Sequence, residues 1–165
     1  MDDVNERAKA QWKEATTSRE RVKEILEQTT EYQTVREIAD RALTSEPTTR
    51  KYLDELVEEG RGVTTQDGRT TKYKRDEGTI VDERIAELRR TTTQQELIQG
   101  IREMKEEIHD YRDTYDVDSP ETLALELEAG DPGWGDVGRW RSTKQNLAIA
   151  KAALQVSEAH RTVEA

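Results

Sequence analysis

Residues 34–60 carry the pattern that most restricts the fold of this chain, because they predict two short helices joined by a brief turn. Thr34 and Glu37 have the spacing of a helix capping box, and apolar residues follow at helical intervals. Ser45 can cap a second helix that has Pro47 in its first turn, where the missing N–H of proline is not needed.

The sequence period changes from helical to extended after the second helix. Gly60 predicts a left-handed end to that helix. Residues 61–75 are rich in Thr, Val and Tyr, and Asp67-Gly68 within them is a strong hairpin signal. A β-hairpin is therefore expected directly after the second helix.

Two further helices are predicted before this motif. The apolar residues of 4–15 recur at intervals of four and three, and residues 18–28 have Ser18 as the expected N-cap. Residues 28–33 lack periodicity and are expected to form a turn. The resulting order of helix, helix, turn, helix and hairpin is that of a winged helix-turn-helix, with the hairpin as the wing.

A helical region with a heptad seam is predicted after the hairpin. Residues 78–90 have apolar residues on one face, Thr91–Thr93 interrupt the pattern, and a longer helix follows. Its apolar residues have the a/d spacing of a coiled coil. Packing inside one subunit would give the same spacing, but the many flanking charges favour a helix of a second subunit. The residues assigned to dimerisation are Leu97, Ile101, Met104, Ile108, Tyr111 and Tyr115.

The last part of the chain is predicted to hold a short helix that opens at Ser119-Pro120, a glycine-rich loop, and a final helix from about Val137 to near Ala159. Trp134 and Trp140 flank the loop. The two indoles either form the walls of a small-molecule effector pocket or anchor the loop onto the helices, and anchoring is favoured because other large apolar residues are scarce.

The fold class is therefore expected to be mainly α with a small β-hairpin wing. Residues 1–76 are assigned to the winged helix-turn-helix domain with its N-terminal helix, and residues 77–165 to a helical, coiled-coil-like dimerisation region. Only 32% of the 165 residues are hydrophobic, and 38% are charged. Such a chain is expected to form thin cores, shared between subunits.

Composition also limits the environment. The chain has no Cys, which excludes disulfides and thiolate metal sites. No apolar run approaches the length of a membrane span, and no N-terminal signal is evident, so a soluble cytoplasmic protein is expected. The 36 acidic residues, the preference for Arg over Lys and the abundant Thr resemble cytoplasmic proteins of extreme halophiles. An ordinary acidic protein is the alternative.

The second helix of a helix-turn-helix enters the major groove of double-stranded DNA and presents its first residues to base edges. Residues 61–75 hold five basic side chains and one acidic one, a net charge of +4 in a chain of net charge -10. This distribution would orient the wing toward DNA. Thr49 is expected to face inward. The candidate DNA-binding residues are Thr34, Ser45, Thr48, Arg50, Lys51, Arg69, Thr70, Lys72 and Lys74.

Residues 47–53 resemble the recognition helix of winged-helix regulators of the ArsR and MarR type, whose pattern is Pro-Thr-Val-Ser-Arg-His-Leu. The resemblance implies DNA contacts at Thr48, Arg50 and Lys51. Residues 11–75 are also similar to a group of haloarchaeal winged-helix proteins. The sequence Gly-Arg-Gly-Val at 60–63 departs from the usual Gly-Leu-Val, which implies a looser entry to the wing.

Other functional classes have little support. His109 and His160 lie far apart without metal-ligand spacing, and no nucleophile, phosphate-loop or zinc motif is present. No metal, cofactor or enzymatic activity is therefore expected, and a small-molecule effector is left open. The expected function is a sequence-specific DNA-binding transcription regulator acting as a homodimer. The alternative is a winged-helix module that binds proteins or serves as a scaffold without reading DNA.

Overall fold

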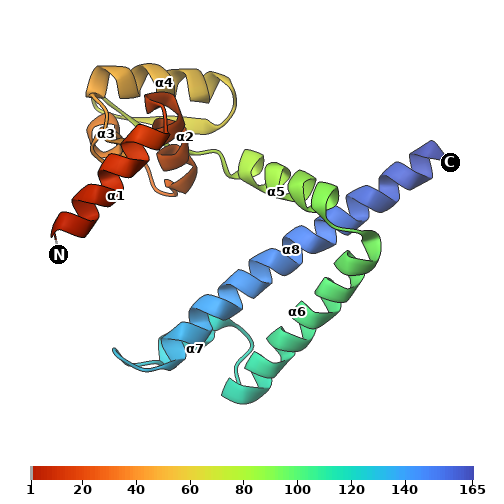
Figure 1. Cartoon of the computed structure of the whole chain (residues 1–165). Helices are drawn as coiled ribbons and strands as arrows, with labels where there is room; N and C mark the ends of the chain where they lie inside the picture. Colours follow the sequence, from red (N-terminus) through yellow and green to blue (C-terminus); the bar gives the residue numbers. More distant parts are fainter. Residues whose placement is uncertain (1) are drawn as a thin grey trace. The chain divides into compact units, whose positions relative to one another are not determined.

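The computed structural model describes residues 2–165 and is mainly helical, with one three-stranded antiparallel sheet (Figure 1). It divides into two compact units, the first ending at Ile80 and the second beginning at Val81. The first unit has the order of a winged helix-turn-helix, which confirms the predicted fold class. Across residues 2–165, no helix is both long and apolar enough to span a membrane.

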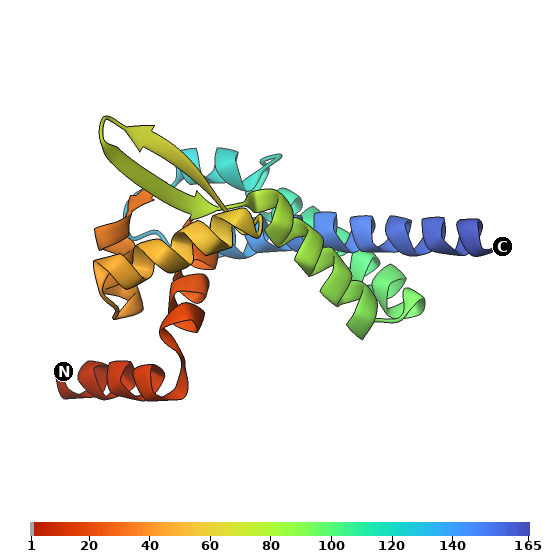
Figure 2. The ribbon, with the colours of Figure 1, turned by 90° about the horizontal axis from the view of Figure 1, so that it is seen from above.

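The first unit contains four helices and the sheet among its described residues. The helices are α1 (Asp2–Ala15), α2 (Ser18–Gln28), α3 (Val35–Ala42) and α4 (Glu46–Glu58). The strands are β1 (Gln33–Thr34), β2 (Gly62–Asp67) and β3 (Thr70–Arg75). β3 lies between β1 and β2, and it pairs antiparallel with both. The hairpin of β2 and β3 lies beside α4 (Figure 2).

Local sequence explains where these helices begin. Thr34 and Glu37 form the predicted capping box, with the Glu37 carboxylate accepting the Thr34 N–H at 2.8 Å. Ser45 caps α4 as predicted. The predicted N-cap of α2 was wrong by one residue: Thr17, not Ser18, caps this helix, because Glu20 stands three residues after Thr17 and completes a second capping box.

The wing and the turn before it also differ in detail from the prediction. The loop of the hairpin is Gly68-Arg69 rather than Asp67-Gly68, because Asp67 pairs with Thr70 as the last residues of the strands. Gly68 has φ of +63°, which suits the first central residue of a two-residue hairpin loop. Part of the segment predicted as a turn forms β1, which joins the sheet beside Tyr73.

The core of the first unit is formed by one apolar face from each of α2, α3 and α4, closed on one side by the sheet. All its members are less than one tenth exposed. They are Val22, Ile25, Leu26, Val35, Ile38, Ala42, Leu53, Leu56 and Tyr73. This packing fixes the angle between α3 and α4 and holds the wing against α4.

The buried Arg21 guanidinium fastens α1 to this core. Its Nε donates to the Ala42 carbonyl at 2.9 Å, and one Nη donates to the Thr16 carbonyl at 2.8 Å. These carbonyls lie at the C-terminal ends of α3 and α1, where the helix dipoles favour a cation. Arg21 is only 3% exposed, and its hydrogen bonds offset the desolvation of its charge.

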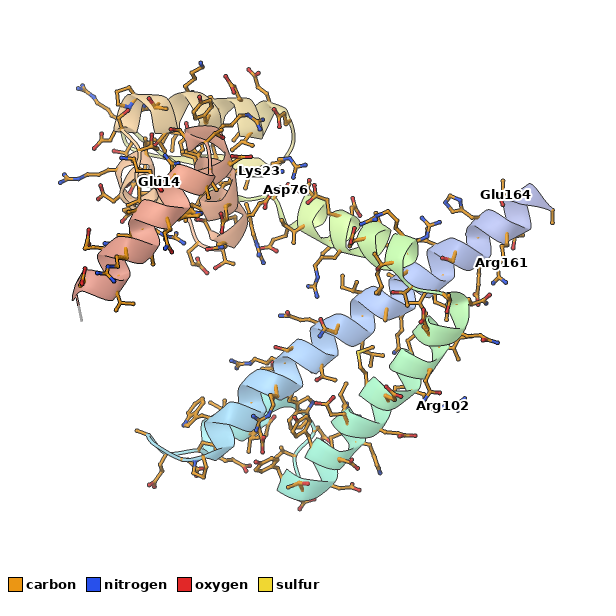
Figure 3. All side chains as sticks on the ribbon, viewed as in Figure 1. Glu14, Lys23, Asp76, Arg102, Arg161 and Glu164 are labelled. Atoms are coloured by element: carbon orange, nitrogen blue, oxygen red, sulfur yellow. The ribbon has the colours of Figure 1, made fainter. Side chains whose placement is uncertain are left out.

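The second unit is helical throughout its described elements. It contains α6 (Gln94–Tyr115), α7 (Pro120–Glu126) and α8 (Gly133–Glu164), and α5 (Glu77–Thr91) leads into it. α6 and α8 lie side by side (Figure 1), and α7 packs on α8. Charged side chains cover the outer faces, as Arg102 on α6 and Arg161 near the end of α8 illustrate (Figure 3).

The heptad seam of α6 packs within the chain. The flanking charges predicted that a helix of a second subunit covers this seam, but the structure places it against α8, where Leu97 and Ile101 form one cluster with Ala150 and Ala153. Further along, Ile108 packs with Val137 and Trp140 in a second cluster that Tyr111 and Tyr115 also contact, while Met104 borders the first. The seam therefore explains how one subunit folds and is no longer an argument for a dimer.

The glycine-rich segment before α8 is shorter than predicted as a loop. α8 begins at Gly133, so Gly133 and Gly135, which precede the predicted start at Val137, are helical. The Asp131 carboxylate accepts the Gly133 N–H at 2.8 Å, and Val137 and Trp140 are buried one and two turns later. Their burial outweighs the low helix propensity of glycine.

Candidate nucleic-acid interface

The turn between α3 and α4 presents the start of α4. Leu43 adopts a left-handed conformation with φ of 53°, and the Thr44 N–H bonds the Ala39 carbonyl at 3.2 Å, which closes the end of α3. Ser45 follows as the cap of α4. Its hydroxyl donates to the Thr48 hydroxyl at 2.9 Å, so these two candidate contact residues form one hydroxyl pair at the helix start.

Arg50 and Lys51 project from the first turns of α4 into solvent. Both are exposed, whereas Thr49 between the cap and these cations is fully buried, as predicted. Among residues 2–165, neither cation forms an ion pair, although the Lys51 ammonium lies 5.5 Å from the centre of the Tyr52 ring. The start of α4 thus offers two cations that no carboxylate of the chain neutralises.

Acidic residues of α4 are directed elsewhere. Glu55 and Glu59 pair with Arg19 of α2, the latter at 2.6 Å. Asp54 accepts a hydrogen bond from Tyr73 of β3 at 2.5 Å. Glu58 and Glu46 are the exceptions, because both are exposed and form no ion pair among the described residues, and Glu46 stands in the first turn. This carboxylate weakens the expectation that the N-terminus of α4 attracts a phosphate.

The positive charge of the wing is mostly paired. Lys72 contacts Asp67 at 2.9 Å, and this hydrogen bond raises the pKa of Lys72 and lowers that of Asp67. Arg75 pairs with Glu77 at 2.9 Å, and Arg61 with Glu27 at 3.2 Å. The net charge of the wing in the sequence therefore overstates the field that it presents to DNA.

Two wing cations remain without a carboxylate within the part of the chain that the structure describes. Arg69 is exposed at the tip of the hairpin, next to the exposed Thr70. The Lys74 ammonium lies 4.8 Å from the centre of the Tyr32 ring, a cation–π contact. The tip of the wing and strand β3 thus keep two cations for an external partner.

Thr34 and Arg36 lie at the start of α3. The Thr34 hydroxyl accepts the Glu37 N–H at 3.2 Å, so this predicted contact residue already serves the capping box. It also stands opposite Lys72 in the sheet. Arg36 is exposed and forms no ion pair among the described residues, but sequence reasoning missed it. Its place on the outer face of a capped helix was the available signal.

The two tryptophans considered for an effector pocket do not share a face of α8. They are six positions apart in the sequence, which places them about 120° apart around a helix. Trp140 is fully buried and stacks on Tyr111 with ring centres 5.5 Å apart. Trp134 is 43% exposed, and its Nε1 donates to the Glu128 carbonyl at 2.9 Å. These contacts anchor the glycine-rich segment onto the helices.

Comparison with known proteins places the chain in a family. A family model matches residues 16–158, which run from the end of α1 almost to the end of α8. The chain belongs to the DUF7342 family. This family is described as one of unknown function. The DUF7342 match spans both the winged unit and the helical unit. Among curated proteins, none matches the chain in sequence.

A search of solved structures finds the Bacillus subtilis PadR protein in complex with operator DNA. The two chains are 12% identical, and the match covers 84% of this chain and 97% of that one with a TM-score of 0.30. A likeness this weak supports no inference about this DUF7342 protein, whose winged fold is established by its own helices and strands.

Within residues 2–165, no group of three or more His, Asp or Glu could hold a metal ion.

Proposed function

We propose that this protein is a sequence-specific DNA-binding transcription regulator. The observation that carries the proposal is the start of α4, where Arg50 and Lys51 remain unpaired beside the Ser45–Thr48 hydroxyl pair. Three of the five wing cations, Arg61, Lys72 and Arg75, are by contrast paired with carboxylates. A chain with 36 acidic residues that leaves these two cations available is suited to bind a polyanion there.

The roles of the remaining contact residues follow from their surroundings. Arg50 is assigned to a guanine edge in the major groove and Lys51 to the same groove or its phosphates. Arg69, Thr70 and Lys74 are assigned to the backbone beside the wing. Lys72 would have to leave Asp67 to reach a phosphate, and Thr34 would have to leave its capping box with Glu37. These assignments extend the resemblance to ArsR- and MarR-type regulators.

We further propose that the protein acts as a homodimer in the cytoplasm of a halophilic archaeon. Support for the dimer comes from the second unit, since α5 buries none of its residues although it carries apolar side chains. Val81 of α5 is 40% exposed, and Ile98 of the neighbouring helix α6 is 42% exposed. A second copy would cover these side chains and would place two recognition helices on one operator.

A protein-interaction module remains the second candidate, and one observation favours it. The wing cations are largely neutralised and Glu46 stands at the start of α4, which lowers the attraction for DNA. A winged helix that docks on a protein needs no unpaired arginine on α4. The two candidates therefore differ in what Arg50 does.

Selection of bound fragments from randomised double-stranded DNA tests the proposal. The purified full chain should enrich one sequence, and fluorescence anisotropy should show weaker binding by the Arg50→Ala variant. Glu58→Gln is the matched control, because this exposed residue lies on the same helix two turns later. If no sequence is enriched over many rounds at several salt concentrations, the regulator proposal is wrong and the protein-interaction alternative gains support.

A further inference from the structure

Tyr73 links the wing to the recognition helix through a carboxylate. It lies in β3, the central strand of the sheet, between Gln33 on one side and Thr64 on the other. The residue is 2% exposed, yet its hydroxyl reaches the surface of α4 and donates to Asp54 Oδ1 at 2.5 Å. Asp54 is itself exposed. Its carboxylate is held in place by the phenol of Tyr73, which cannot move freely because its ring is buried.

Arg50 is the natural alternative partner of Asp54. The two residues are four apart on α4, the spacing at which opposite charges meet on a helix surface. The structure nevertheless shows no ion pair of Arg50 with any residue that it describes, and Asp54 is bonded to Tyr73 instead. Lys51, three residues before Asp54, is unpaired as well.

The pKa of Tyr73 responds to its burial and to both of these neighbours. Burial is the main reason that the pKa of Tyr73 is raised to about 12, and the hydrogen bond to Asp54 raises it further. The charge of Arg50 acts in the opposite direction on the same phenol. Arg50 stands one helical turn before Asp54, within reach of its carboxylate, but Asp54 is bonded to Tyr73 instead.

We propose that Tyr73 is a positioning residue that draws Asp54 toward the wing and so keeps Arg50 available to DNA. The inference rests on the proposed function and adds a residue that the sequence analysis did not assign to the interface. Tyr73 itself touches no DNA in this scheme, because it is buried. Its hydroxyl acts by occupying Asp54, one of the two carboxylates of α4 that stand four residues from Arg50; the other, Glu46, forms no ion pair with it among the described residues.

Removing the hydroxyl should release Asp54 to Arg50. In Tyr73→Phe the ring still fills the core, but the Asp54 carboxylate loses its donor and can pair with Arg50 one turn earlier. DNA must then displace this ion pair before Arg50 reaches a base. The expected loss of affinity for the selected sequence is about twofold, the size of an i,i+4 ion pair on a helix.

A double-mutant cycle separates this role from a purely structural one. Affinities are measured for the wild type, Tyr73→Phe, Asp54→Asn and the double variant, on the selected DNA and on DNA changed at the base pair that Arg50 reads. Tyr73→Phe should reduce both affinity and discrimination in the Asp54 background and should change neither in the Asn background. Glu58→Gln measures the general gain from removing one acidic charge on α4. Equal losses in both backgrounds would show that Tyr73 only supports the wing and would overturn the proposal.

A measurement without DNA makes the two proposals separable. The Nε–Hε resonance of Arg50 is followed by NMR in the free protein. It should shift between the wild type and Tyr73→Phe, and it should not shift between Asp54→Asn and the double variant. An unchanged resonance in Tyr73→Phe overturns the positioning role even if DNA binding is observed. A shifted resonance in a protein that selects no DNA supports the positioning role and contradicts the proposed function instead.

Discussion

Thr49→Val is expected to stabilise the winged unit, which is unusual for a substitution in a fully buried position. Thr49 is 0% exposed in α4, and its Oγ1 has no hydrogen-bond partner among the described residues. A buried hydroxyl without a partner costs about 1–3 kcal/mol. Valine has nearly the same shape, so the substitution removes this penalty without creating a cavity or losing a β-branched rotamer.

The expected gain is about 1 kcal/mol in the free energy of unfolding, which is the lower end of that penalty. For a unit of this size, a gain of about 1 kcal/mol raises Tm by roughly 4–8 °C. Hydrogen exchange of the buried amides of α4 reports the stability of the winged unit separately from that of the helical unit. DNA binding should be unchanged, because Thr49 faces the core.

Thr29→Val is the matched control, since Thr29 is the other fully buried threonine of the winged unit. Its hydroxyl donates to the Ile25 carbonyl at 2.6 Å and accepts from Arg41 at 3.2 Å. Loss of two bonds should lower the free energy of unfolding by about 1–2 kcal/mol. Replacing Thr by Val should therefore change the free energy of unfolding in opposite directions at the two sites. Destabilisation at Thr49 would refute the reasoning, because it would mean that the hydroxyl has a partner.

The remaining predictions concern the interface, the second unit and the solvent. Arg50→Ala should relax preference at one base position per half-site, by about 1–3 kcal/mol of discrimination, whereas Lys72→Ala should weaken all sequences alike in the same anisotropy assay. Ile98→Asp should lower the dimer fraction in light scattering while circular dichroism stays unchanged; an unaltered dimer would exclude this face of α6. The backbone N–H of Thr93 lowers the pKa of Glu96, so its contribution to stability is present above pH 4.5 and is lost as the pH falls through the lowered pKa; Glu96→Gln should flatten this part of the acid denaturation curve. DNA binding should depend weakly or non-monotonically on potassium salt between roughly 0.2 and 2 M, where screening reduces both phosphate attraction and carboxylate repulsion, and a steep monotonic loss with the fold intact would contradict the halophile proposal.

Local signals in the sequence were reliable for the helix ends of the winged unit. Ser45 and the Thr34–Glu37 box were predictable because a cap depends on residues three positions apart. The same rule, applied to Thr17 and Glu20, would have corrected the misplaced cap of α2. The wing was predictable from its turn signal, although strand pairing rather than the turn decided which two residues form the loop.

Signals that depend on tertiary packing were less informative. The heptad spacing of α6 shows that one face is buried, but it cannot show whether the covering helix belongs to the same chain, and here α8 covers it. The start of α8 was missed because burial of Val137 and Trp140 outweighs the preference of the neighbouring glycines for a loop. The net charge of the wing misled for a similar reason, since Glu27 and Glu77 pair with its arginines from outside it.

Protection of guanine N7 from dimethyl sulfate tests the central claim most directly, because N7 lies in the major groove, where α4 is proposed to bind. The full chain is bound to its selected DNA fragment, and methylation is compared between the wild type and Arg50→Ala under conditions in which both are fully bound. The wild type is expected to protect guanines in each half-site, and one of these guanines is expected to become accessible in Arg50→Ala. A pattern that is identical in the two proteins, or the absence of any protected guanine, would contradict the placement of α4 in the groove.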